Sequence, residues 1–189
     1  MEILLNIDYN EEWESKVTFN LSKNEKEKIK KQIDFGNIKK YSIANIGPDA
    51  DWFVILLLLD LGLQLIKVGA DINDGIDGWI GLGKKLIKLF HRNKIVSIDI
   101  DGATALAINQ IAKKQKINRL EKINESIINL VDLSGVIHGN KGLSKTPHNY
   151  YIQSYCINNS DVYVIGIKST GEVKIIKHFV LSLHGIEEI

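Results

Sequence analysis

Cysteine and proline are nearly absent from this sequence of 189 residues, and arginine occurs only twice. The single cysteine, Cys156, excludes an intramolecular disulfide framework and any zinc site built from cysteines. The formal net charge is only +1, which argues against a general nucleic-acid binder, because affinity for phosphates requires a clear excess of basic residues. We therefore expect neither a disulfide-stabilised fold nor a nucleic-acid partner.

The sequence also lacks a long hydrophobic run, and we expect no signal peptide. Its most apolar stretch, 52–66, contains only eight consecutive apolar residues, far fewer than the ~20 that span a bilayer. The first eight residues have no basic region and include the acids Glu2 and Asp8. These features predict a soluble, cytoplasmic protein without stable membrane insertion.

Isoleucine, lysine and asparagine are in excess and together supply 69 of the 189 residues. Such enrichment is typical of AT-rich genomes, and it predicts an origin in a low-GC bacterium. The remaining balance, 44% hydrophobic and 25% charged residues, is close to that of an ordinary globular domain. A disordered chain would combine a high net charge with few apolar residues, so we expect a folded protein.

Apolar periodicity predicts about five helices. Their expected ranges are 23–34, 52–66, 76–91, 103–114 and 120–131. The second and third would form a helical hairpin over 50–92, because the linker between them is short. The spacing of Leu120, Ile123 and Ile127 makes the last helix the clearest in the chain.

Runs of β-type residues predict strands towards both ends of the chain. Their expected ranges are 2–9, 15–20, 38–46, 94–100, 150–157, 162–168 and 173–183. The first two would form an N-terminal hairpin and the last three an antiparallel meander over 150–183, which follows a long loop over 134–148 that is either functional or disordered. The fold class predicted for 1–189 is a single α+β domain, in which one antiparallel sheet from the hairpin and the meander packs against a layer of mid-chain helices.

The sharpest motif is VSIDIDGAT over 96–104, in which an apolar strand ends in Asp99, Asp101 and Gly102. It resembles the first motif of the haloacid dehalogenase-like phosphatases, although Ala103 stands where that family has threonine. The resemblance implies that Asp99 is a nucleophile and Asp101 a general acid, with magnesium between them. The alternative interpretation is structural: Asp99 is a polar strand position and Asp101 caps the next helix. We favour the structural interpretation, because short motifs often match by chance.

Charged residues are segregated along the chain. Acidic residues gather at 11–14 and 71–77, whereas 84–94 carries five lysines and arginines without an acid. Such a surface suits a specific partner better than bulk nucleic acid. The candidate binding residues are Trp13, Lys84, Lys85, Lys88, Arg92, His138, Lys141, Lys145 and His148.

These features favour a small cytosolic binding protein without catalytic activity, which acts through a protein–protein surface as a bacterial accessory or immunity-type protein. We expect no cofactor and no metal, since the histidines lack the spacing of metal ligands. One alternative is a magnesium-dependent phosphoryl-transfer enzyme that uses Asp99 and Asp101. A second is a membrane-perturbing protein built on the amphipathic hairpin over 52–90.

Overall fold

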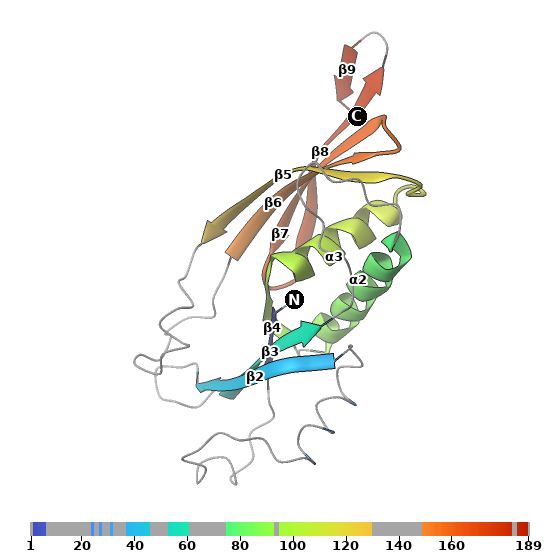
Figure 1. The fold of residues 1–189 in the computed structure, drawn as a ribbon. Helices are drawn as coiled ribbons and strands as arrows, with labels where there is room; N and C mark the ends of the chain where they lie inside the picture. The colour runs from blue at the N-terminus through green and yellow to red at the C-terminus, as the bar shows by residue number, and fades with distance from the viewer. Residues whose placement is uncertain are drawn as a thin grey trace.

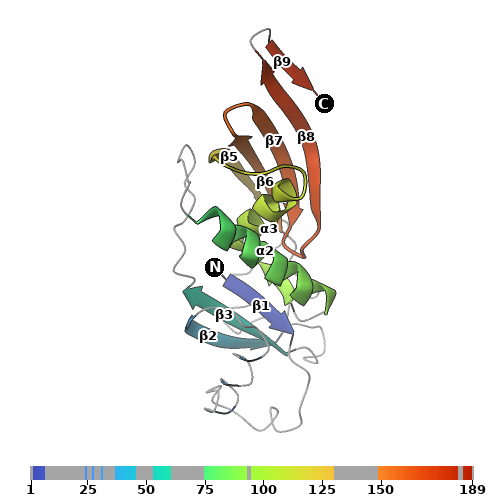
Figure 2. The same cartoon turned by 90° about the vertical axis from the view of Figure 1, so that its right-hand side faces the viewer.

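The computed structural model describes residues 2–6, 37–45, 53–60, 75–92, 95–129, 149–182 and 185–188, and the single positions Asn24, Glu27 and Lys31. Within these residues the chain forms two antiparallel sheets and two helices. The helices lie between the two sheets in both views (Figure 1, Figure 2). The architecture is therefore α+β, as the sequence predicted, but its strands form two sheets where one was expected.

The first sheet has four strands in the order β2-β3-β1-β4. Its strands are β1 (Glu2–Asn6), β2 (Asn37–Asn45), β3 (Phe53–Asp60) and β4 (Ile95–Ile98). Strands β2 and β4 confirm the predictions for 38–46 and 94–100. Strand β1 pairs with β3 on one side and with β4 on the other. The predicted N-terminal hairpin is therefore wrong, because no side of β1 remains for the segment 15–20, which lies outside the described residues.

Strand β3 corrects the prediction of a helix over 52–66 and of a helical hairpin over 50–92. Its eight residues, FVILLLLD, lie between β2 and β1 in the sheet. A short continuous apolar run is compatible with either a buried helix or an interior strand, and a length of eight residues suits the strand. Pairing with β2 and β1 stabilises this segment as a strand, and the local sequence does not reveal these neighbours.

The second sheet has five strands in chain order. They are β5 (Leu120–Asn129), β6 (Asn149–Ile157), β7 (Asp161–Lys168), β8 (Val173–Ser182) and β9 (Gly185–Glu188). Strands β6 to β8 confirm the predicted meander over 150–183. The turn between β6 and β7 contains Asn158 and Asn159, whose φ angles are 53° and 64°. Asparagine tolerates this left-handed conformation better than most residues, which makes the turn predictable.

Strand β5 corrects the prediction of a helix over 120–131. Leu120, Ile123 and Ile127 have helical spacing in the sequence, but the segment pairs along its whole length with β6. Ile123 and Ile127 are exposed, so the supposed apolar stripe does not face a core. Pairing with a strand that lies far along the chain overrode the local periodicity.

Two helices with defined bounds lie between the sheets in the described part of the chain. They are α2 (Ile76–His91), which confirms the prediction for 76–91, and α3 (Ile100–Ala112), which begins three residues before the predicted 103–114. Helix α3 is buried at every position from 102 to 109 and is the central helix of the core. Gly83 of α2 lets the two helices approach closely, because a Cβ there would lie 2.4 Å from the carbonyl oxygen of Ala105.

Among the described residues, hydrogen bonds join the two sheets around Ile98. The hydroxyl group of Tyr151 on β6 donates to the carbonyl oxygen of Ile98 on β4 at 3.0 Å. The backbone N–H of Ile98 donates to the carbonyl oxygen of Ser169, in the turn between β7 and β8, also at 3.0 Å. The two sheets and the helices therefore share one framework around Ile98.

Other predicted elements are covered only in part. Asn24, Glu27 and Lys31 are helical and exposed, as expected for a surface helix over 23–34, whereas the loop 134–148 lies outside the described residues. Bounds are thus defined for two helices of the five predicted. In the part of the chain that the structure describes, neither helix is long and apolar enough to cross a membrane. The alternative of a membrane-perturbing protein loses its helical hairpin over 52–90, because β3 occupies the first half.

Candidate functional site

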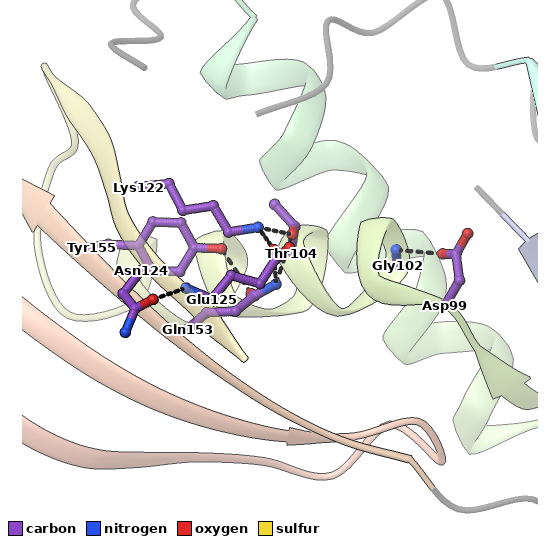
Figure 3. A network of polar contacts seen from close by, with 8 residues as sticks. All are labelled: Asp99, Gly102, Thr104, Lys122, Asn124, Glu125, Gln153 and Tyr155. Carbon is purple, nitrogen blue, oxygen red and sulfur yellow. Dashed lines mark hydrogen bonds and ion pairs between the residues drawn. The ribbon is translucent and has the colours of Figure 1, made fainter. Parts of the chain in front are cut away.

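A cluster of five polar side chains lies between α3 and the first two strands of the five-stranded sheet (Figure 3). It contains Thr104 from α3, Lys122 and Glu125 from β5, and Gln153 and Tyr155 from β6, and we call it the polar network. Four of these side chains are buried, and the Lys122 side chain is only 3% exposed. Glu125, with 27% of its side chain exposed, is the member that reaches solvent.

A β-bulge brings the two charged members of the polar network to the same face of the sheet. Residues three apart on a regular strand point to opposite faces. In β5 the register shifts between Lys122 and Asn124, so that Ile123 is an extra residue. Lys122 then lies opposite Tyr155, and Glu125 lies opposite Gln153. Tyr155 and Gln153 are both on the inner face of β6, so the two charged side chains share that face.

Hydrogen bonds connect all five side chains. The Thr104 hydroxyl oxygen accepts from Lys122 Nζ at 3.2 Å and from Gln153 Nε2 at 2.9 Å. Lys122 also forms an ion pair with the carboxylate of Glu125, to which Gln153 Nε2 donates at 3.3 Å. The Tyr155 hydroxyl group donates to Gln153 Oε1 at 2.7 Å. The polar network therefore fastens β5 and β6 to the central helix.

Burial shifts the titration of two members of the polar network. It lowers the pKa of Lys122 to about 8, against the opposing effect of the negative charge of Asp101. It raises the pKa of Tyr155, and a hydrogen bond with Thr104 opposes this change. An amine with a pKa near 8 could act as a general base or a nucleophile. The Lys122 amine is enclosed, however, so we interpret the polar network as structural support for β5.

The two aspartates of the phosphatase-like motif have different positions on α3. Asp99 is the N-cap residue, and its carboxylate accepts a hydrogen bond from the backbone N–H of Gly102 at 3.0 Å (Figure 3). Asp101 lies in the first turn of the helix, so the prediction that Asp101 is the cap is wrong by two residues. Among the described residues there is no group of three or more His, Cys, Asp or Glu side chains that could hold a metal ion.

The free side of β5 carries exposed apolar side chains. β5 is the first strand in the order of its sheet, so one side has no neighbouring strand within the described residues. Ile123, Ile127 and Ile128 are 43%, 48% and 45% exposed. We call this unpaired side of β5, with its three isoleucines, the β5 edge.

The candidate binding residues predicted from charge are divided between the described and the undescribed parts of the chain. Lys84, Lys85, Lys88 and Arg92 lie on α2 or directly after it and are exposed. The other candidates lie outside the described residues: Trp13, His138, Lys141, Lys145 and His148. The structure therefore places four of the nine, three on α2 and Arg92 directly after it.

A pocket of about 450 Å³ lies between α2 and the end of α3. It is lined by Asp77, Ile80, Lys84, Asn109, Ala112, Lys113, Gln115, Lys116 and Ile117. Of these, only Lys84 was singled out from the sequence. The sequence also marked a second lining residue, Asn109, since it interrupts an alanine- and isoleucine-rich helix. No such signal marked the polar network, because it forms only where α3, the bulged strand β5 and β6 meet.

The chain was compared with known families, curated proteins and solved structures. None of the three comparisons found a match. The function is therefore inferred from the geometry of the chain itself.

Proposed function

We propose that this protein binds another protein by pairing the β5 edge with an extended segment of that partner. β5 is ten residues long and contains no proline. On the free side of an edge strand, backbone N–H and C=O groups have no strand partner and form a template for pairing. An added strand would satisfy these groups, as in recognition by β-strand addition.

Exposed isoleucines on both faces of β5 support this proposal. Ile127 lies opposite Tyr151 on the inner face of the sheet, whereas Ile128 lies opposite Tyr150 on the outer face. A strand added at the β5 edge would find apolar neighbours for its side chains above and below the sheet. Natural edge strands are commonly protected by charged residues, and 126–129 contains none. The exposed, uncharged half of β5 is the observation that carries the proposal.

The polar network would hold the β5 edge in a conformation that is ready for binding. Lys122 and Glu125 fix the first half of β5 against Thr104 of the central helix. A surface that is already ordered loses little conformational entropy on association. The ion pair of Lys122 and Glu125 thus supports the neighbouring exposed half without contacting the partner.

In the finer form of the proposal, the protein is a non-catalytic cytoplasmic protein of accessory or immunity type. A single free cysteine, Cys156, suits a reducing compartment. The exposed cations of α2 and the candidate Trp13 would add a second contact region. Phosphoryl transfer is not proposed, because the carboxylate of Asp99 serves as a helix cap.

Site-specific cross-linking in the native cell tests the proposal. A photoreactive residue at Ile127 should give a defined adduct with one partner protein, and Ile127→Lys should weaken binding of that partner by about 10-fold or more. The matched control is Ile152 on β6, which pairs with Ser126 of β5 on one side and with Gly166 of β7 on the other. The same adducts from both positions, or none from Ile127, would contradict the proposal.

A further inference from the structure

The pocket between α2 and α3 offers binding groups that the β5 edge does not use. On α2, Asp77, Ile80 and Lys84 follow one another at three- and four-residue spacing and line one wall. The end of α3 and the residues after it supply the opposite wall. A volume of about 450 Å³ lies within the range of small-molecule sites.

Asn109 is the most informative residue of this pocket. It is only 1% exposed, and neither its Nδ2 nor its Oδ1 has a hydrogen-bond partner among the described residues. Gln115, which also lines the pocket, has a buried Nε2 without a partner. Buried polar side chains in folded proteins nearly always have partners. The unpartnered amide of Asn109 and the unpartnered Nε2 of Gln115 lie at one pocket, which indicates that a ligand supplies the missing groups.

The charged residues define the chemistry of that ligand. Lys84, Lys113 and Lys116 line the pocket together with one acid, Asp77, which leaves an excess of positive charge. Lysine ammonium groups are common ligands of phosphate, which they bind as point charges. We propose that this pocket binds the phosphate monoester of a small molecule, with the phosphate held by the lysines.

The remaining lining residues fit the uncharged part of such a molecule. Ile80 on one wall and Ile117 on the other supply apolar contacts. The Asn109 amide can both donate and accept hydrogen bonds, and the Asp77 carboxylate accepts them from a hydroxyl or amino group. A nucleoside monophosphate combines a phosphate, a flat apolar ring and several donors, so adenosine 5′-monophosphate is a suitable probe.

A simpler explanation accounts for only part of this arrangement. Cations near the C-terminus of a helix are stabilised by the helix dipole, and Lys113 and Lys116 lie at or just after the end of α3. Lys84 is in the middle of α2, so the dipole does not explain its position. The helix dipole also does not account for the buried amide of Asn109, which has no hydrogen-bond partner among the described residues.

Nuclear magnetic resonance of the full chain tests the proposal. The side-chain amide signals of Asn109 and Gln115 are followed while inorganic phosphate, adenosine 5′-monophosphate or adenosine is added at constant ionic strength. We expect saturable shifts with inorganic phosphate and adenosine 5′-monophosphate. Adenosine should bind at least about 10-fold more weakly than its monophosphate.

Variants separate a binding role from a structural one. Lys84→Gln and Lys116→Gln should each weaken binding of adenosine 5′-monophosphate about 10-fold, whereas Lys114→Gln, an exposed lysine that does not line the pocket, should leave it unchanged. Asn109→Leu removes the unpartnered amide. It should raise the melting temperature by about 2–6 °C and abolish the ligand-induced shift at Gln115.

Three results would overturn the proposal. The first is the absence of saturable shifts with both inorganic phosphate and adenosine 5′-monophosphate up to about 20 mM. The second is an equal loss of affinity in Lys114→Gln and Lys84→Gln. The third is an Asn109→Leu variant that melts below the wild type and still binds the monophosphate. None of these results depends on the β5 edge, so the two proposals fail independently.

Discussion

At the scale of single residues, Lys122 makes the clearest thermodynamic prediction. Burial lowers its pKa in the folded protein to about 8, below the ordinary value of 10.5. Between these values the unfolded chain binds more protons than the folded one, so stability rises as the pH rises. Below pH 8 both states are protonated, and the full cost of burying the ammonium group remains.

Urea denaturation of the wild type and of Lys122→Met at several pH values measures this effect. The stability of the wild type relative to the variant should increase by about 2–3 kcal/mol between pH 7 and pH 10. The raised pKa of Tyr155 is common to both proteins, so its contribution cancels in the difference. A difference that does not change with pH would show that Lys122 is not buried as described.

The aspartate pair shows what a short motif can and cannot reveal. The sequence indicated correctly that a strand ends near Asp99 and that a carboxylate caps the next helix. It could not decide between Asp99 and Asp101, because both precede the same helix and either could reach a backbone N–H. The choice depended on where α3 begins, and that position is set by packing in the core.

At the scale of elements, the contact between α2 and α3 depends on Gly83. An added Cβ at this position would lie 2.4 Å from the Ala105 carbonyl oxygen and 2.5 Å from Asn109 Cβ, so the helices would have to separate. We expect Gly83→Ala to destabilise the protein by about 1–3 kcal/mol. At Gly81, on the same helix, a Cβ would meet nothing within 4 Å. Gly81→Ala should therefore stabilise the protein by about 0.5–1 kcal/mol.

The free energy of unfolding of the two variants, measured by urea denaturation, checks this contrast. Opposite signs are expected, because the two positions share a helix and differ in what surrounds them. If both variants were stabilised, the close packing of α2 against α3 would be contradicted.

The sequence predicts most elements in which the spacing of apolar residues matches the face that packs into the core. Helix α2 and the meander β6 to β8 agree with the sequence, because their apolar faces point into the core and their turns have suitable residues. Strands β3 and β5 were mistaken for helices, since an unbroken apolar run and a bulged strand both imitate helical patterns. Their identity depends on distant strands, which a local pattern does not contain.

At the scale of the whole molecule, the described residues form two sheets with helices between them, and no described strand pairs with the free side of β5. The sequence predicted a binding protein and candidate cations on α2, but not this edge. It could not, because an edge is defined by the order of strands in a sheet. The pocket at Asn109 could not be predicted from the sequence either, because it exists only where two helices meet.

Amide hydrogen exchange of the protein in complex with its cross-linked partner tests the proposed strand pairing most directly. Backbone amides along β5 alternate between β6 and the free side, so those facing β6 are protected before the partner binds. On binding, the account predicts new protection at alternate residues of Leu120–Asn129, on the free side of β5. New protection confined to α2, with β5 unchanged, would contradict it.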